Sequence, residues 1–236
     1  MEPTIEQDQP LSNPGGRAGM AAVVGRANVG KSTLINHLLQ EKISIVTPIA
    51  QTTRNTIRGV LTEPRGQLVF LDTPGVHKAP HELGKVMNKM ARASVEGVDV
   101  ILLVLDASTP PRQEDEGWVR RIMREEAACF VVLNKLDQGD EHAGAYRKLW
   151  KDNAAELGTE KEASWFATSA EEGTGTEALL DALFNHMPVS PYLFPEDVLT
   201  DFPRKLAMGE VIREKVIVRL HEELPHSIAV SVDRID

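Results

Sequence analysis

Short apolar runs alternate with amphipathic stretches along most of the chain. Runs with so few polar positions are typical of strands buried on both faces of a parallel sheet, and the stretches between them have helical spacing. The alternation therefore predicts an α/β fold built on a doubly wound, mostly parallel sheet. The expected strands are Met20–Val24, Gln67–Leu71, Val98–Leu105, Ala127–Leu133 and Ser164–Ala167. The expected helices are Ser32–Gln40, a part of Val76–Gly97, Asp115–Glu125, Ala143–Leu157 and Gly175–His186.

A second kind of pattern precedes the strand at Gln67. Thr56–Thr62 and Gln67–Leu71 flank the turn sequence Glu63-Pro64-Arg65-Gly66, and the polar segment Glu41–Arg58 leads into the first of them. Two strands joined by so short a turn pair antiparallel. We therefore expect one antiparallel strand at the edge of the sheet.

The two ends of the chain differ from its middle. Met1–Gly19 is polar and rich in proline and glycine and has no apolar centre, so we expect a disordered tail (residues 1–19) rather than a secretory signal. Residues 188–203 contain four prolines, which suit a linker between residues 20–187 and residues 204–236. Beyond the linker, Leu206–Leu220 has helical spacing and Ser227–Val232 alternates like a strand.

Composition places the chain among globular proteins. Of its 236 residues 42% are hydrophobic and 26% are charged, and no apolar run approaches the length of a membrane-spanning helix. The single cysteine, Cys129, lies in an apolar run and is expected to be a core residue in a reducing compartment. The net charge of −9 argues against nucleic-acid binding by the chain as a whole.

The chemistry begins directly after the first expected strand, with Gly-Arg-Ala-Asn-Val-Gly-Lys-Ser. This sequence fits the phosphate-binding loop G-x-x-x-x-G-K-[ST], and its strand–loop–helix setting is the one that the motif requires. Backbone N–H groups of such a loop point at phosphate oxygens, the lysine reaches the β- and γ-phosphates, and the serine ligates magnesium. The expected nucleotide-binding residues here are Gly25, Arg26, Ala27, Asn28, Val29, Gly30, Lys31, Ser32 and Thr33, with Lys31 catalytic and Ser32 a metal ligand.

The choice of base is predicted by Asn134-Lys135-Leu136-Asp137, at the carboxyl end of an expected strand. The Asp137 carboxylate can accept two hydrogen bonds from guanine, whereas adenine would leave a buried carboxylate unpaired. We expect Asn134 to fix the neighbouring loop and contact the base edge, and the Lys135 stem to lie along the ring. Ser169 and Ala170, in Thr-Ser-Ala after another strand, fit the loop whose N–H meets guanine O6.

Asp72-Thr73-Pro74-Gly75 lies between these two motifs and also follows a strand. Asp72 is suited to a magnesium role through a bound water, and the Gly75 N–H can approach a γ-phosphate because no side chain intervenes. Many signalling GTPases place a glutamine directly after this glycine, but this chain has Val76, which cannot polarise water. The sequence thus predicts a GTP/GDP site with Mg²⁺ and a slow intrinsic hydrolysis.

The motif series Gly-Arg-Ala-Asn-Val-Gly-Lys-Ser, Gln-Thr-Thr-Arg-Asn-Thr-Ile-Arg-Gly, Asp-Thr-Pro-Gly, Asn-Lys-Leu-Asp and Thr-Ser-Ala-Glu-Glu-Gly resembles the Era family of ribosome-assembly GTPases. Residues 20–190 resemble its P-loop GTP-binding domain, and Phe194–Asp197, Glu210–Lys215 and Glu222–Ser227 resemble the junction to its RNA-binding domain. Ala27 is a departure, since the family usually carries proline there.

The resemblance implies several further properties. Residues 204–236 would be the first helix and strand of a small α+β K-homology (type II-like) domain that is incomplete here. The implied partners are 16S rRNA and the small ribosomal subunit. Residues 191–236, however, carry six basic and nine acidic residues, so we expect RNA binding by this chain to be weak or absent. Thr53 resembles the switch threonine over Mg²⁺ and the γ-phosphate, with Thr52 as the fallback, and Asn28 is compatible with either a K⁺-holding role or a solvated loop. A monomer in the cytoplasm is implied, with peripheral contact at the inner face of the cell membrane as an option.

Three functions are compared on these grounds. The first is a GTP-hydrolysing switch in small-subunit assembly, and the second is a GTPase of another class, such as a tRNA-modification or signalling switch. The third is a metabolic P-loop kinase, against which Asn-Lys-x-Asp demands guanine. Outside the motifs, Glu114-Asp115-Glu116 is expected to be an exposed face, and Arg58 fits a partner surface or a solvated charge equally well.

Overall fold

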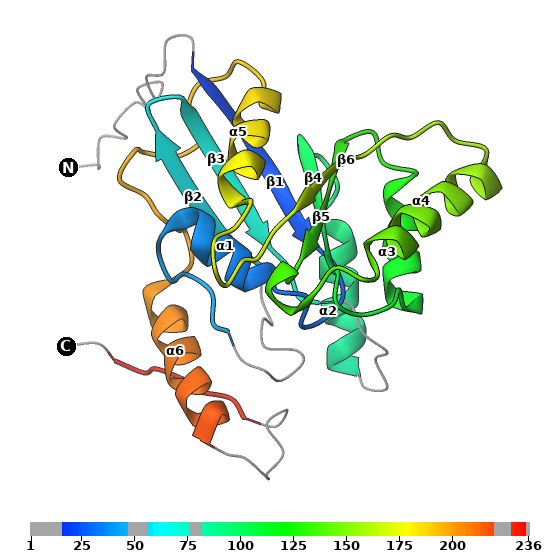
Figure 1. The fold of residues 1–236 in the computed structure, drawn as a ribbon. Coiled ribbons are helices and arrows are strands. Elements are labelled where there is room, and N and C mark those ends of the chain that lie inside the picture. The colour runs from blue at the N-terminus through cyan, green and yellow to red at the C-terminus, as the bar shows by residue number, and fades with distance from the viewer. Residues whose placement is uncertain (1–15, 47–55, 76–81, 220–227, 235–236) are drawn as a thin grey trace.

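A six-stranded sheet forms the centre of the protein in the computed structural model, which describes residues 16–46, 56–75, 82–219 and 228–234 (Figure 1). The strand order is β2-β3-β1-β4-β5-β6, and every neighbouring pair is parallel except β2 with β3. The expected α/β class and the antiparallel edge strand are confirmed. The strands are β1 (Arg17–Val24), β2 (Ile57–Glu63), β3 (Gly66–Asp72), β4 (Val100–Asp106), β5 (Ala128–Asn134) and β6 (Ser164–Ala167).

Helices cover both faces of the sheet, which makes it doubly wound (Figure 1). Residues of α1 and α5 join one buried apolar cluster, and residues of α2, α3 and α4 join the other. Because strand side chains alternate in direction, Ala21 and Val23 of β1 belong to the first cluster and Ala22 and Val24 to the second. The helices are α1 (Lys31–Leu39), α2 (Glu82–Ala93), α3 (Gln113–Ile122), α4 (Ala143–Leu157), α5 (Thr176–His186) and α6 (Arg204–Arg219), with a short 3₁₀ helix η1 (Leu136–Gln138).

The beginning of β1 differs from the expectation. The strand begins at Arg17 rather than at Met20, so the end of the expected tail belongs to the sheet. Arg17 and Ala18 lie opposite Gly66 and Gln67 of β3. The reason is that β3 extends as far as Gly66, so its backbone can pair with residues that precede Met20. A polar residue such as Arg17 is tolerated at a strand end.

The expected strand at Ser227–Val232 is not formed in its described part. Residues 228–234 have no regular secondary structure and run alongside α6 (Figure 1). The Lys205 ammonium donates to the Asp233 carbonyl at 2.6 Å, and the Val230 carbonyl lies close to Gly209 of α6. An alternating sequence becomes a strand only when another strand pairs with it, and no described segment lies in position to do so.

The proline-rich segment between α5 and α6 packs along the edge of the sheet instead of standing free. The fully buried Gln67 accepts from the Leu193 and Phe194 backbone N–H groups at 2.8 and 2.9 Å and donates to the Phe194 carbonyl at 2.9 Å. Further along, the Val60 N–H donates to the Leu199 carbonyl at 2.8 Å, and Arg58 pairs with Asp201. The segment is therefore anchored to β2 and β3, and Arg58 has a partner within the chain.

Helix α6 lies beside the segment that leaves α1 (Figure 1). The buried Glu214 carboxylate accepts from the Lys42 ammonium at 2.8 Å and from the Val46 N–H at 3.2 Å. Among the helices of the described ranges, none is long and apolar enough to cross a membrane.

Candidate functional site

The phosphate-binding loop joins β1 to α1 in a conformation that its sequence dictates. Gly30 caps α1 with a φ of 96°, and a Cβ at this position would lie 2.3 Å from the Asn134 amide nitrogen. Only glycine satisfies both conditions. The Lys31 ammonium donates to the Gly25 and Arg26 carbonyls at 3.2 and 2.8 Å, so one of its N–H groups is left for a ligand.

Lys31 is buried, and this burial lowers the pKa of its ammonium to about 8, although Asp72 nearby opposes the shift. A buried cation that lacks a close anionic partner favours the arrival of an anion, because the anion restores the lost solvation. The end of α1 contributes its unpaired N–H groups and the positive end of its dipole at the same place. The loop therefore fits a polyphosphate.

Ser32 and Asp72 meet where the sequence places a magnesium site. The Ser32 hydroxyl donates to Asp72 Oδ2 at 2.8 Å, and Asp72 Oδ1 is buried without a hydrogen-bond partner. Burial raises the pKa of Asp72 above the ordinary aspartate value, against the hydrogen bonds and the Lys31 charge that lower it. Two hard oxygen ligands, one of them unsatisfied, fit Mg²⁺.

The Asp-Thr-Pro-Gly segment at the end of β3 closes against the phosphate loop. The Thr73 hydroxyl donates to the Val23 carbonyl at 2.8 Å, and Thr73, Pro74 and Gly75 are all buried. A Cβ at Gly75 would lie 2.7 Å from the Ala27 Cα and 3.1 Å from the Lys31 ammonium. Gly75 thus lies next to the group expected to bind the terminal phosphates, which agrees with its predicted role.

Asn134 joins the phosphate loop to the loop after β6. Its amide donates to the Val29 carbonyl at 2.9 Å, and its side-chain oxygen accepts from the Thr168 hydroxyl at 3.0 Å and the Ala170 N–H at 2.9 Å. These three contacts are all with protein groups. They support the predicted loop-fixing role of Asn134, and its contact with a base edge stays a prediction.

Lys135 and Asp137 follow at the surface. Lys135 adopts a left-handed backbone conformation with φ 69°, and its ammonium donates to Asp106 Oδ2 at 2.9 Å. The exposed Asp137 carboxylate accepts from the buried Ser169 hydroxyl at 2.6 Å, which fixes its position and leaves its second oxygen available. Sequence reasoning expected a buried carboxylate here. Asp137 is instead exposed to solvent.

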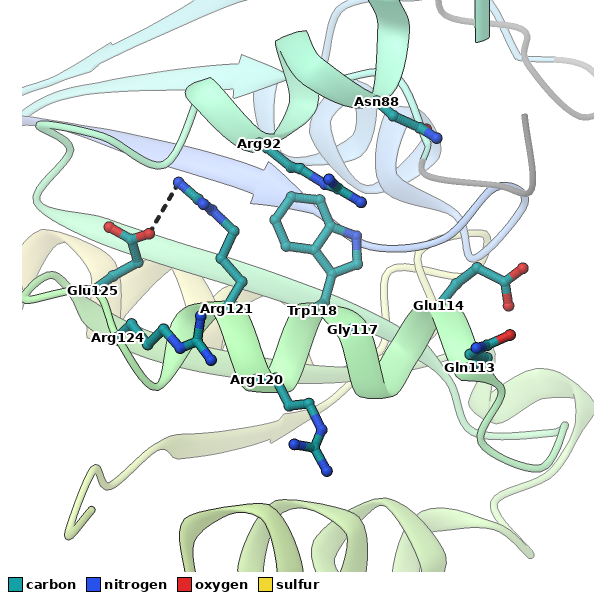
Figure 2. A pocket seen from close by; sticks show the side chains of 10 residues that line it. All are labelled: Asn88, Arg92, Gln113, Glu114, Gly117, Trp118, Arg120, Arg121, Arg124 and Glu125. Atoms are coloured by element: carbon teal, nitrogen blue, oxygen red, sulfur yellow. Dashed lines mark ion pairs between the residues drawn. The ribbon is translucent and has the colours of Figure 1, made fainter. Parts of the chain in front are cut away.

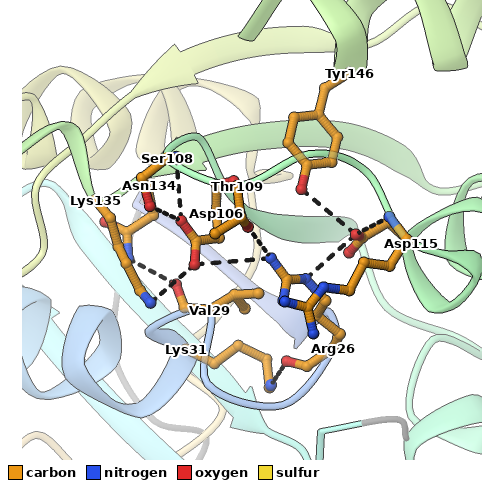
Figure 3. Close-up of polar contacts among 11 residues, drawn as sticks. Arg26, Val29, Lys31, Asp106, Ser108, Thr109, Asp115, Asn134, Lys135 and Tyr146 are labelled. Atoms are coloured by element: carbon orange, nitrogen blue, oxygen red, sulfur yellow. Dashed lines mark hydrogen bonds and ion pairs between the residues drawn. The ribbon is translucent and has the colours of Figure 1, made fainter. Parts of the chain in front are cut away.

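The Arg26 side chain turns away from the phosphate loop into a buried ion network (Figure 3). Its Nη2 lies 3.7 Å from Asp106 Oδ2, and its Nε lies 3.2 Å from Asp115 Oδ2. Neither Arg26 Nε nor Asp115 Oδ1 has a hydrogen-bond partner. The attraction between Arg26 and Asp115 is therefore mainly electrostatic. Asp115 is fully buried, and the expectation of an exposed acidic face at residues 114–116 is wrong for it.

The charges of this network shift the pKa values of its members. Burial would raise the pKa of Asp106, but hydrogen bonds from Ser108 and Lys135 outweigh burial and lower it. Burial raises the pKa of Asp115 despite a backbone hydrogen bond and the Arg26 charge. Burial, and then the Asp115 charge, raise the pKa of Tyr146 to about 12, and its hydroxyl donates to Asp115 at 3.4 Å. Asp106 therefore holds two cations, one from the phosphate loop and one from the base loop.

The structure thus brings the phosphate loop, Asp72–Gly75, Asn134–Asp137 and Ser169–Ala170 together at the carboxyl ends of β1, β3, β5 and β6. Thr53 and Val76 lie outside the described residues, and their roles stay predictions. Sequence analysis missed Asp106, although an aspartate directly after a continuous apolar strand was a usable signal. Asp115 and Tyr146 gave no such signal, because each lies on an ordinary amphipathic helix.

The comparisons with known proteins agree with this geometry. The sequence model of a family described as "50S ribosome-binding GTPase" matches residues 20–135. GTPase Era of Nostoc sp. is 36% identical over 229 residues, which cover 96% of this chain and 69% of that protein. The chain belongs to the Era family of GTPases. It is a GTP-hydrolysing enzyme that uses guanine nucleotide and Mg²⁺.

Solved structures of this family resemble the chain over most of its length. A crystal structure of Era with MgGDPNP and a piece of 16S ribosomal RNA is 36% identical, with a TM-score of 0.81, and covers 93% of this chain and 73% of that one. Aquifex aeolicus Era bound to GDP and AlF₄⁻ gives a TM-score of 0.79 at 36% identity, covering 92% of this chain and 73% of that one. By contrast, Toc33 from Arabidopsis thaliana, at 15% identity and a TM-score of 0.56, covers 72% of this chain and 85% of its own, and shares the fold alone.

Proposed function

We propose that this Era-family GTPase is a nucleotide-controlled switch in the assembly of the small ribosomal subunit, with 16S rRNA as its partner. The observation that carries the proposal is the extent of the match to Era. That match covers 93% of the chain, whereas the fold-level match to Toc33 covers 72%. A GTPase of another class has no reason to share the region beyond the GTP-binding domain.

The family description names the large subunit, and the Era structure contains RNA of the small one. The description belongs to a sequence model that ends at residue 135, within the part that many GTPases share. The Era match extends much further and at 36% identity. It therefore supports the small subunit more strongly.

Hydrolysis requires a water in line with the γ-phosphate and neutralisation of the charge on the leaving oxygens. Lys31 and the loop amides supply positive charge to these oxygens, and Ser32 and Asp72 would hold Mg²⁺, which neutralises charge on the β- and γ-oxygens when bound. A Cβ at Gly75 would lie 3.1 Å from the Lys31 ammonium, and this closeness supports our proposal that the Gly75 N–H contacts the terminal phosphate. Thr53 completes the site in our proposal as the residue that covers the metal and the γ-phosphate.

The attacking water has no glutamine to orient it, because Val76 follows Gly75. We propose that a K⁺ ion held with the help of Asn28 supplies the missing charge. Asn28 has a φ of 62° and an exposed side chain on the phosphate loop, which supports a role for its amide oxygen as a K⁺ ligand. GTP turnover should then fall when KCl is replaced by NaCl at constant ionic strength. Equal turnover in the two salts would remove K⁺ from the proposal.

Helix α6 provides a route by which nucleotide state reaches the C-terminal part. Glu214 accepts from the Val46 N–H at 3.2 Å, and Val46 directly precedes the segment that contains Thr53. If that segment rearranged around the γ-phosphate, the hydrogen bond from the Val46 N–H to Glu214 of α6 would change. RNA binding and GTP binding would then be coupled, each affecting the other by the same factor.

Cosedimentation with ribosomal particles tests the proposed role. The chain is mixed with separated small and large subunits, with GDPNP or with GDP, and the bound fraction is measured. Because RNA binding by this chain is expected to be weak, we expect a small bound fraction. This fraction should be larger with the small subunit than with the large one and should depend on the nucleotide, with the Lys31→Ala variant showing no dependence. Equal binding to both subunits in both nucleotide states would contradict the proposal, and the intrinsic GTPase activity, measured in parallel, would remain unaffected by that outcome.

A further inference from the structure

A cavity of about 450 Å³ lies between α2 and α3, on the face of the sheet that carries α2, α3 and α4 (Figure 2). Its walls include Asn88 and Arg92 of α2 and Trp118 and Arg121 of α3. The volume falls within the range of small-molecule sites, roughly 300–1,000 Å³. None of the predicted nucleotide-binding residues that the structure describes borders it.

Two hydrogen-bond donors in the wall of this cavity have no acceptor. Trp118 is 2% exposed, and its indole Nε1 is buried without a partner. Arg121 Nε is also buried without a hydrogen-bond partner. Buried donors in native proteins are nearly always satisfied, and an unpaired one costs free energy. An acceptor from outside the chain would satisfy the Trp118 indole.

The charge of the cavity wall identifies the kind of acceptor. The wall holds four arginines and two glutamates, Glu114 and Glu125, and Arg121 already pairs with Glu96 and Glu125. Arg120 points away from the cavity towards α4, where it pairs with Glu156 (Figure 2). Arg92 lies next to the Trp118 ring and has no ion pair with any carboxylate of the described residues (Figure 2). Among the described residues, the two lining arginines without an ion pair, Arg92 and Arg124, outnumber the one unpaired lining glutamate, Glu114, and this excess of positive charge favours an anion.

We propose that the cavity between α2 and α3 binds a small organic anion, in which a carboxylate or phosphate group is attached to a flat apolar body. The oxyanion accepts from the Trp118 indole and the Arg92 guanidinium beside it. The apolar body lies against the Trp118 ring and the aliphatic stems of the arginines. Guanidinium groups bind carboxylates and phosphates in the same planar geometry, so the wall alone permits both.

The test uses the indole N–H of Trp118 as the reporter. In ¹H–¹⁵N spectra of the protein saturated with GDP and Mg²⁺, the Trp118→Phe variant identifies the Trp118 cross-peak among the three tryptophan indoles. Benzoate, phenyl phosphate and the neutral benzyl alcohol are then titrated separately. We expect a saturable shift of this cross-peak with at least one of the two anions, at roughly millimolar concentration, because such probes are small.

Variants separate this site from general charge effects. Arg92→Gln should weaken binding of the active anion about tenfold by removing one charge-assisted contact. Arg147→Gln removes the same charge from α4, where Arg147 lies over the Trp165 ring, and should leave the affinity unchanged. A response to benzoate alone identifies a carboxylate ligand, and a response to phenyl phosphate alone identifies a phosphate ester. An unmoved Trp118 cross-peak at about 10 mM of both anions, an equal response to benzyl alcohol, or unchanged affinity in Arg92→Gln would overturn the proposal.

Discussion

Removal of the Arg26 guanidinium should destabilise the protein far more than removal of a surface arginine. Arg26 is 7% exposed and lies between Asp106 and the fully buried Asp115. Asp106 keeps Lys135 and Ser108 when Arg26 is truncated to alanine. Asp115 keeps only the Arg112 N–H at 2.9 Å and the Tyr146 hydroxyl at 3.4 Å, neither of which is charged. The cost therefore falls mainly on Asp115.

The expected loss in the free energy of unfolding is about 3–5 kcal/mol at neutral pH, the usual cost of leaving a buried charge without its partner. Its pH dependence follows from the raised pKa of Asp115. A carboxyl whose pKa is higher in the folded state favours folding at low pH, and this advantage disappears as the pH rises through the folded-state value. Loss of the Arg26 charge raises that pKa further, so the deficit of Arg26→Ala should be smaller at about pH 5 than at about pH 7.5.

Urea unfolding of the nucleotide-free protein at these two pH values measures the deficit. Arg58→Ala is the matched control, because Arg58 forms an ion pair with Asp201 that is exposed to solvent, and its loss should cost less than about 1 kcal/mol. The double variant Arg26→Ala with Asp115→Asn should recover at least about 1 kcal/mol relative to Arg26→Ala alone. If Arg26→Ala were no worse than Arg58→Ala, or if Asp115→Asn gave no recovery, the charge argument would be refuted.

Four shorter predictions concern the nucleotide site and the edge of the sheet. Lys31→Ala should weaken GTP binding by at least about 100-fold in a fluorescent-nucleotide titration, since the charge that contacts the phosphates is lost; unchanged affinity would contradict the phosphate-loop assignment. Because the Lys31 pKa is lowered to about 8, GTP affinity should fall as the pH rises above that value, by up to about tenfold per unit, and a flat profile would show that its charge is not required. Asp137→Asn should weaken GTP binding by about 100-fold and favour xanthosine triphosphate, which presents an acceptor in place of the guanine amine; retained guanine selectivity would disprove its role. Gln67→Ala should lower the free energy of unfolding by about 1–2 kcal/mol, because the Leu193 and Phe194 N–H groups lose their acceptor but remain partly accessible to water, whereas Glu196→Ala should change it by less than about 0.5 kcal/mol.

Local sequence patterns were sufficient to predict the elements whose formation depends only on residues close together in the chain. The strand before Gly25, the helix after it and the motif between them can be recognised in one stretch of sequence. The structure has both elements, although the strand begins earlier than expected, at Arg17. Helix α4 has the predicted bounds, because its apolar spacing is regular and Gly158 ends it in a left-handed conformation. The strand expected at Ser227–Val232 failed for the opposite reason. Strand formation depends on a neighbour, which alternation within one segment does not supply.

The sequence by itself predicted the chemistry of this protein: a phosphate loop, an aspartate for the metal and an aspartate for guanine, each near the end of a buried strand. These motifs are short, and their spacing along the chain is sufficient to identify them. Only the tertiary structure decided which charges support them. Arg26, Asp106, Asp115 and Lys135 come from four separate segments, and Gln67 meets Leu193 and Phe194 across the edge of the sheet. Such contacts depend on the distance between side chains after folding. Asp115 belongs to a sequence that is typical of an exposed helix face, and it is buried only because the surrounding elements pack over it.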